Sequence, residues 1–122
     1  MFKETKAFSG FSVDDIPAAK EFYAGTLGLE VTEDNGMLQL RIAGGNPVLV
    51  YPKDDHVPAE FTILNFPVND IAAAARGLAD RGVTFERYGD GHDELGVFRA
   101  GGPPIAWFKD PAGNVLSVIK TD

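Results

Sequence analysis

Histidine and cysteine, the side chains best suited to proton transfer and nucleophilic chemistry near neutral pH, are scarce in this 122-residue sequence. There are two histidines and no cysteine, which excludes thiol catalysis, zinc–thiolate sites and iron–sulfur clusters. His92 and Asp93 are neighbours in the glycine-rich stretch 88–96, and His56 lies in a separate polar stretch. Together with the phenol of Tyr51, His92 and Asp93 are the candidate catalytic groups, suited to general acid–base chemistry.

The stretch around His92 has two interpretations. It is either a mobile lid that carries an imidazole and carboxylates over a cleft, or a solvated glycine-rich loop, which is the usual state of such segments. Neighbouring side chains cannot easily converge on one ion, so we expect no metal site from His92, Asp93 and Glu94 alone. No Ser/His/Asp order, phosphate-binding glycine loop or dinucleotide fingerprint occurs in the sequence.

Composition narrows the class of protein further. Eighteen acidic and 11 basic side chains give a net charge of −7, which argues against nucleic acid or an anionic membrane as partner. No run approaches the ~18 apolar residues of a membrane-spanning helix, and the first residues lack a secretory apolar core. We therefore expect a cytoplasmic protein, and the length predicts one domain because single domains cluster near ~100–150 residues.

An internal similarity organises the chain. FSVDDIPAAKEFYA (11–24) and FPVNDIAAAARGLA (66–79) are identical at seven of 14 positions at an offset of 55. A second echo pairs VLVYPK (48–53) with VLSVIK (115–120) at an offset of 67, which places about 12 extra residues in the region 88–102 of the second copy. This pattern predicts one domain, 1–122, built from a module at 1–53, a linker at 54–59 and a module at 60–122.

Each copy predicts one strand, one helix and three further strands. Apolar residues recur at helical spacing at Ile16, Ala19 and Tyr23, and Asp15 and its counterpart Asp70 are suited to cap the two helices. The sequence contains eight candidate strands: Lys6–Val13, Glu30–Glu33, Met37–Ile42, Pro47–Tyr51, Glu60–Val68, Thr84–Arg87, Pro104–Phe108 and Asn114–Ile119. Two β-α-β-β-β halves of this kind predict an α+β fold.

This order of residues resembles the vicinal oxygen chelate superfamily, which includes glyoxalase I, extradiol dioxygenases and bleomycin-resistance proteins. The matching pieces are Val13-Asp14-Asp15 into Phe22-Tyr23, Leu27-Gly28-Leu29-Glu30-Val31, Val68-Asn69-Asp70 into Arg81-Gly82-Val83, and Phe108-Lys109-Asp110-Pro111-Ala112-Gly113-Asn114. The resemblance covers nearly the whole chain. It implies two βαβββ modules curled around a cleft, and a homodimer, but it does not fix the reaction because members of the superfamily carry out different chemistry.

The resemblance also implies four metal-ligand positions, one on the opening strand and one on the last strand of each module. Counting from the capping aspartates and along the two echoes, these positions fall on Phe8, Val50, Ile63 and Ser117. Three hydrocarbon side chains and one hydroxyl cannot replace the hydration shell of a divalent ion. We therefore expect no metal at this site and no cofactor.

The predicted cleft wall combines apolar and hydrogen-bonding side chains, which is the usual composition of a small-molecule pocket. Alternation along the strands adds Ser12 and Asn65 to the wall, and Trp107 supplies an aromatic surface. The expected ligand-binding residues are Phe8, Ser12, Val50, Ile63, Asn65, Trp107 and Ser117. The alternative is that this face closes as a second dry core or packs against another subunit.

The sequence thus favours a metal-independent protein that binds a small apolar or aromatic molecule. A glyoxalase- or dioxygenase-like lyase or isomerase with a non-standard site, using His92, Asp93 or Tyr51, is the alternative from another functional class. A structural dimerisation module with a filled cleft is the third. The identity of the ligand, the biological role and the way the modules pair across subunits stay open at this point.

Overall fold

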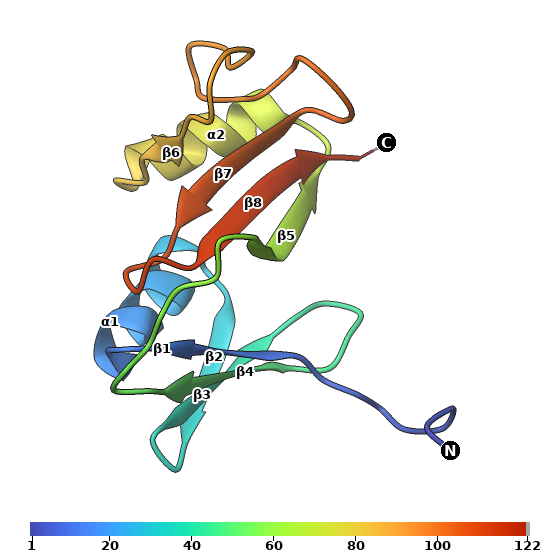
Figure 1. The fold of residues 1–122 in the computed structure, drawn as a ribbon, viewed down its shortest axis with the longest axis vertical. Coiled ribbons are helices and arrows are strands. Elements are labelled where there is room, and N and C mark those ends of the chain that lie inside the picture. The colour runs from blue at the N-terminus through green and yellow to red at the C-terminus, as the bar shows by residue number, and fades with distance from the viewer. Residues whose placement is uncertain (122) are drawn as a thin grey trace. The chain divides into compact units, whose positions relative to one another are not determined.

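The computed structural model describes residues 1–121 as two compact units, one spanning Met1–Val57 and one that begins at Pro58. The boundary between the units lies inside the stretch 54–59 that the sequence indicates as a linker. Each unit has its own four-stranded sheet and its own helix (Figure 1). Among the residues described, no helix has the length and hydropathy needed to span a bilayer.

Unit 1 follows the predicted β-α-β-β-β order. Its elements are β1 (Gly10–Val13), α1 (Ile16–Lys20), η1 (Glu21–Thr26), β2 (Glu30–Asp34), β3 (Met37–Arg41) and β4 (Val48–Pro52). The strands lie in the order β1-β4-β3-β2, with β1 parallel to β4 and the other neighbours antiparallel. Phe11, Tyr23, Leu38 and Val50 are buried on the helix side of this sheet, with the rings of Phe11 and Tyr23 5.8 Å apart.

The helix of unit 1 starts where the capping residue predicts and then widens. The Asp15 carboxylate accepts a hydrogen bond from the Ala18 backbone N–H at 3.0 Å, which satisfies one of the unpaired donors of the first turn. From Glu21 the helix continues as the π-helix η1, and the Leu27 N–H closes it on the Phe22 carbonyl at 2.9 Å. Gly28 follows with φ +72°, a conformation that glycine adopts without strain.

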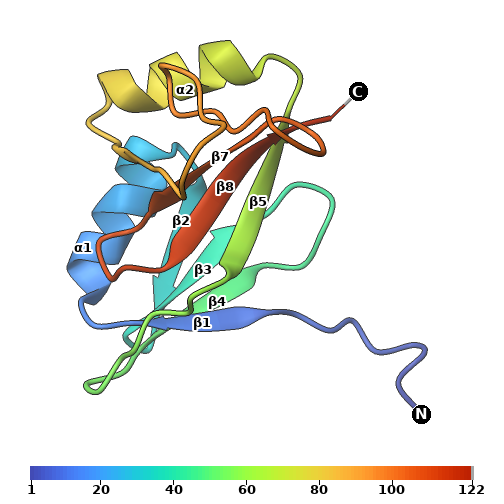
Figure 2. The same cartoon turned by 45° about the horizontal axis from the view of Figure 1, so that its top comes forward.

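Unit 2 repeats this plan. Its elements are β5 (Thr62–Val68), α2 (Ile71–Asp80), β6 (Phe85–Glu86), β7 (Ile105–Lys109) and β8 (Val115–Lys120), with strand order β5-β8-β7-β6. Asp70 caps α2 by accepting from the Ala73 N–H at 3.0 Å. Figures 1 and 2 show α2 lying along one face of this sheet, where Ile71 and Ala75 are buried.

The α+β class and the two βαβββ modules are therefore confirmed, with shorter strands at several ends. The strand expected at Lys6–Val13 begins only at Gly10, and the one expected at Thr84–Arg87 is reduced to Phe85–Glu86. Residues 6–9 precede the paired part of the sheet, although the Leu49 N–H still donates to the Ser9 carbonyl at 3.0 Å.

Strand pairing corrects one detail of the repeat. Phe11 lies opposite Val50 in unit 1, and Phe66 lies opposite Val118 in unit 2. The offset is 55 between the opening strands (66 − 11) and 68 between the last strands (118 − 50), whereas the letters align at 67. The third strands agree with 68, since Leu38 pairs with Val50 and Ala106 with Val118. The structural counterpart of Ser117 in unit 1 is therefore Leu49.

The turn between β7 and β8 is held by a buried carboxylate. Asp110 is 5% exposed and accepts hydrogen bonds from the backbone N–H groups of Ala112 and Asn114 at 3.0 and 2.9 Å. Its second oxygen accepts from the Asn114 side-chain amide at 3.0 Å. This network closes the Asp-Pro-Ala-Gly-Asn turn, which joins the antiparallel strands β7 and β8.

Replacing Asp110 should therefore weaken the fold markedly. In Asp110→Ala three buried or partly buried donors lose their acceptor, which we expect to lower the free energy of unfolding by about 2–4 kcal/mol. Urea denaturation followed by circular dichroism measures this loss. Asp80→Ala, an exposed substitution at the end of α2, is the matched control and should change stability by less than about 0.5 kcal/mol; equal losses in the two variants would contradict the role of the network.

Candidate functional site

In each unit, one face of the sheet is turned away from the unit's own helix, and we call it the distal face. Side chains alternate along a strand, so the residues beside buried Leu38 and Val50 point the opposite way. These residues are Gln39 and Leu49, which lie opposite each other across β3 and β4. Gly10 pairs with Leu49 on the next strand, and its lack of a side chain leaves space over that part of the distal face.

Val50 does not belong to this face. It is fully buried and lies between Phe11 and Leu38 in the sheet, on the side packed against α1 and η1. The one-residue difference in offset explains the change, because a shift of one residue moves a side chain to the other face of a sheet. Leu49 therefore takes the place on the distal face that the sequence indicated for Val50.

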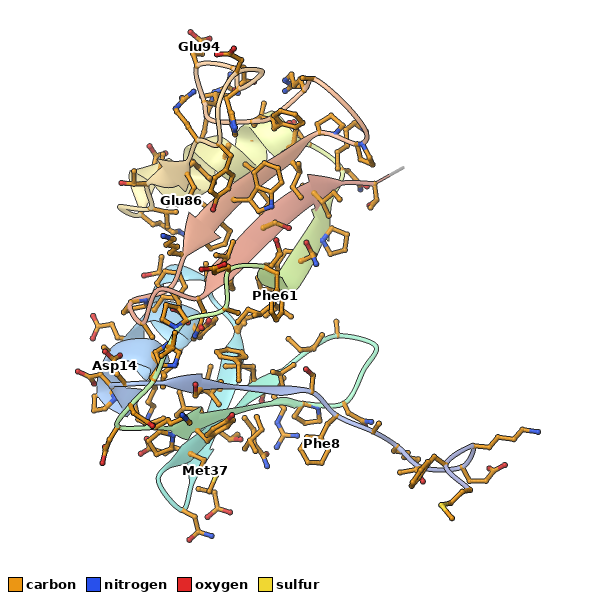
Figure 3. The ribbon with its side chains drawn as sticks, viewed as in Figure 1. Phe8, Asp14, Met37, Phe61, Glu86 and Glu94 are labelled. Atoms are coloured by element: carbon orange, nitrogen blue, oxygen red, sulfur yellow. The ribbon has the colours of Figure 1, made fainter. Side chains whose placement is uncertain are left out.

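A hollow of about 210 Å³ lies on the distal face of unit 1, lined by Lys6, Phe8, Gln39, Asn46, Pro47 and Leu49. Two of its lining residues come from the segment before β1, where Figure 3 labels Phe8. Phe8 is 66% exposed and lines the hollow, so it presents an aromatic side chain there. The Asn46 side-chain amide donates to the Ala7 carbonyl at 2.8 Å, which ties this segment to the turn between β3 and β4.

Unit 2 carries the equivalent positions with different contents. By the pairing offsets, Gln39 corresponds to Trp107, Leu49 to Ser117 and Gly10 to Asn65. Ser117 is fully buried, and its hydroxyl donates to the Asn65 side-chain carbonyl at 2.5 Å. The expected residues Asn65, Trp107 and Ser117 are therefore neighbours across β5, β8 and β7.

Ile63 and Phe8 are related by the same offset of 55, but Ile63 sits at an irregularity. The pairing of β5 with β8 passes from Thr62 opposite Val115 to Leu64 opposite Leu116, so Ile63 is the extra residue of a bulge. Bulges re-aim the side chain that they contain, and Ile63 is half-buried.

The extra residues of the second module form the segment 87–104, which connects β6 to β7 where unit 1 has only the tight turn after Asp34. This confirms the placement of the insertion. The segment folds back over Trp107: the rings of Tyr88, His92 and Phe98 lie 5.4, 6.1 and 5.9 Å from the Trp107 ring. An aromatic cluster thus occupies the distal face of unit 2 at the position equivalent to the hollow of unit 1.

His92 fastens this segment through both ring nitrogens. Nε2 accepts a hydrogen bond from the Tyr88 backbone N–H at 3.1 Å, and Nδ1 donates to the Gly96 carbonyl at 2.8 Å. The pair of contacts fixes one neutral tautomer. Because Nε2 is already an acceptor within the segment, taking up a proton from a substrate would require breaking a structural hydrogen bond.

Asp93 has a similar structural part. Its carboxylate accepts hydrogen bonds from the backbone N–H groups of Leu95 and Val97, both at 2.9 Å, and from Arg99 Nε at 2.9 Å. Partial burial alone would raise the pKa of Asp93, but the Arg99 and backbone hydrogen bonds outweigh it and hold the pKa below its usual value. Figure 3 labels Glu94 at the tip of the segment, where its side chain is exposed.

The remaining polar candidates of unit 1 lie along β1 and β4. Ser12 pairs with Tyr51 in the sheet, and its hydroxyl lies 2.6 Å from His56 Nδ1. Tyr51 is 37% exposed. The contact between Ser12 and His56 fastens the polar stretch after β4 to the opening strand, so His56 has a place in the structure that its position in a linker did not indicate.

The positions at which the fold family holds a metal ion do not fit one in this chain. With the corrected register they are Phe8, Leu49, Ile63 and Ser117, of which three are hydrocarbon and the fourth donates its hydroxyl proton to Asn65. Divalent ions need several oxygen, nitrogen or thiolate donors. Within residues 1–121, no group of three His, Cys, Asp or Glu side chains is placed to hold a metal ion.

Comparison with known proteins agrees with this fold. Residues 8–118 match the Glyoxalase/Bleomycin resistance protein/Dioxygenase superfamily, and the chain belongs to this superfamily. No curated protein sequence matches it.

Solved structures with the same fold include a glyoxalase family protein from Enterococcus faecalis, 22% identical over 98% of this chain and 99% of that one, with a TM-score of 0.71. TnmS3, described as an antibiotic-binding protein from Streptomyces sp. CB03234, is 24% identical over 98% of both chains, with a TM-score of 0.70. A superfamily member from Sphaerobacter thermophilus DSM 20745 is 24% identical over 94% of this chain and 97% of that one, with a TM-score of 0.68. At these identities the likeness concerns the fold.

Sequence reasoning did not single out most residues that line the hollow. Gln39, Leu49, Asn46, Pro47 and Lys6 entered only with the structure. The period-two alternation along β3 does carry a signal for Gln39, since it separates the buried residues Leu38 and Leu40. No local pattern identifies Lys6, because the segment before β1 reaches the hollow through a contact with a distant turn.

The hydrogen bonds of Asp93 predict a pH-dependent contribution to stability. Since the pKa of Asp93 is lowered in the folded chain, this contribution is present above the unfolded pKa of about 3.9 and is lost as the pH falls through the folded pKa. Asp93→Asn should lower the free energy of unfolding by about 1–2 kcal/mol at pH 7, and the difference from the unmodified protein should shrink at pH 3. Urea unfolding at both pH values measures this, and Asp90→Asn, at an exposed position of the same segment, is the control and should change the free energy of unfolding by less than about 0.5 kcal/mol at pH 7.

Gly96 supplies a second test of the segment 87–104. It has φ +97°, and a Cβ at this position would lie 2.8 Å from the Phe85 Cβ, so alanine is strained by both backbone conformation and overlap. We expect Gly96→Ala to destabilise the protein by about 2–4 kcal/mol, whereas Gly101→Ala in the same segment meets nothing within 4 Å and should be tolerated. Trp107 is the single tryptophan, so its fluorescence during unfolding reports directly on this region; similar stability of both variants would contradict the described packing.

Proposed function

We propose that this protein is a metal-independent binding protein for a small apolar or aromatic molecule. The observation that carries the proposal is the hollow on the distal face of unit 1, where the positions that hold a metal ion elsewhere in the fold family present the hydrocarbon side chains of Phe8 and Leu49. Such a surface contributes affinity through burial of apolar area and needs no chemical step.

The superfamily and one structural neighbour support this choice. The superfamily includes bleomycin-resistance proteins by its description, and the fold of TnmS3, described as an antibiotic-binding protein, matches nearly the whole chain. Ser12 lies on the same face of β1 as Gly10, so it stays a proposed ligand-binding residue of unit 1. Asn65 and Trp107 stay proposed ligand-binding residues on the distal face of unit 2. Homodimer formation and a cytoplasmic location stay predictions made from the sequence.

The contacts of His92 and Asp93 make binding a better conclusion than catalysis. Both side chains form hydrogen bonds to backbone groups within the segment 87–104. These bonds stabilise the conformation of the segment, and they occupy the atoms that a catalytic pair would present to a substrate. For a protein that only sequesters its ligand, this arrangement is sufficient.

The proposal predicts that Phe8 contributes to affinity. Among neutral one- and two-ring aromatic compounds, such as 2-naphthamide, we expect some to raise the thermal midpoint of the protein, because a ligand that binds only the folded state stabilises it. For the best of these, Phe8→Ala should weaken binding about 5–10-fold in isothermal titration calorimetry, the loss expected for one aromatic contact.

Phe2→Ala is the matched control, since Phe2 is an exposed aromatic residue of the same N-terminal segment, 75% exposed, that does not line the hollow. It should leave the affinity unchanged, and addition of EDTA should leave it unchanged as well. Absence of any midpoint shift across the compounds would favour the filled-cleft interpretation, and equal losses in the two phenylalanine variants would remove the hollow from the binding site.

A further inference from the structure

The polar side chains of the hollow point to the charge of its ligand, a step that rests on the binding function proposed above. Half of the lining is apolar, from Phe8, Pro47 and Leu49, and the other half is Lys6, Gln39 and Asn46. A lysine beside an apolar surface is often paired with a carboxylate, and such surface ion pairs are common and weak. Lys6 has no such partner among residues 1–121.

Two side-chain amides, those of Asn46 and Gln39, line the hollow together with Lys6 and form different hydrogen bonds. Asn46 uses its side-chain N–H on the Ala7 carbonyl at 2.8 Å, one residue from Lys6 and from Phe8, so it holds both beside the hollow. Gln39 accepts at its side-chain oxygen from the Thr32 hydroxyl at 3.4 Å, an orientation that leaves the Gln39 N–H₂ group as a donor. Lys6 and Gln39 therefore both offer hydrogen-bond donors to a hollow whose other lining includes the apolar side chains of Phe8, Pro47 and Leu49.

The negative net charge of the protein bears on how an anionic ligand could bind to this donor pair. At −7 the protein repels anions at long range, so an anionic ligand gains nothing from steering and depends on close contacts. Arg41 follows Gln39 by two residues on the same face of β3, but it lies opposite Glu30 in the sheet. Arg41 does not line the hollow, so Lys6 is the one cation among the six lining residues.

We infer that the hollow takes a small aromatic carboxylate. The ring would lie against Phe8, Pro47 and Leu49, and the carboxylate would accept hydrogen bonds from the Lys6 ammonium and the Gln39 amide. The volume of about 210 Å³ is below the roughly 300–1,000 Å³ of pockets for drug-sized ligands, which favours compounds with one or two rings. Charge-assisted hydrogen bonds are about twice as strong as neutral ones, so the acid should bind more tightly than its uncharged analogue.

A matched pair of probes tests the inference: 2-naphthoic acid and 2-naphthamide share a ring system and differ in charge. We expect the acid to bind the unmodified protein about 5–10-fold more tightly than the amide in isothermal titration calorimetry, with a preference that decreases as salt is added. Lys6→Met should reduce the affinity for the acid to that for the amide while leaving the amide affinity unchanged. Lys3→Met removes a lysine of the same segment that does not line the hollow and should preserve the preference.

The outcomes separate this inference from the binding function on which it rests. Equal affinity for acid and amide in the unmodified protein overturns the inference and leaves the binding function intact. A preference for the acid that survives in Lys6→Met overturns the assignment to Lys6. Failure of both probes and of the neutral aromatic compounds to bind overturns the binding function together with the inference. Lys3 and Lys6 lie outside any helix or strand, and circular dichroism of both variants checks that the fold is retained.

Discussion

The parallel pairing of the opening strand with the last strand of each unit is the constraint on which the rest of the structure depends. It places β1 beside β4 in unit 1 and β5 beside β8 in unit 2. The register of each pair determines which side chains face the helix. With Phe11 opposite Val50 and Phe66 opposite Val118, one face of each sheet becomes core. The other face then receives Leu49 in unit 1 and Ser117 in unit 2. A slip of one residue would exchange the two faces completely, so the register defines the site as much as the residue types do.

Short-range features of the fold were predictable because their causes lie close together in sequence. Asp15 and Asp70 cap their helices through N–H groups three residues away, and the order of strands follows from alternation and turn residues. The position of Val50 was not predictable in the same way. Val115–Val118 are all buried, so alternation in the last strand of unit 2 carries no information about its faces. The similarity of the letters then favoured an alignment one residue away from the pairing.

The insertion illustrates a different limit. The location of the insertion was predictable from the difference between the two repeat offsets. Its conformation depends on contacts of Tyr88 and Phe98 with Trp107, which no local sequence pattern indicates. The polar, glycine-rich composition of 88–96 is typical of a solvated loop, whereas the structure uses His92, Asp93 and Gly96 to fasten the segment to itself. As a result, the two units present related surfaces with different contents: an aromatic cluster in unit 2 and a hollow in unit 1.

The segment before β1 has a consequence for the rate at which a ligand could enter and leave the hollow. Residues 6–9 lie outside the strands of the sheet, and the Asn46–Ala7 contact together with the Leu49–Ser9 contact holds them in place. Exposed segments that are held by few hydrogen bonds open locally at a small fraction of the free energy of global unfolding. If the proposed ligand binds in this hollow, we therefore expect its exchange to follow the local opening of residues 6–9, with both sheets intact, and not the global unfolding of the core.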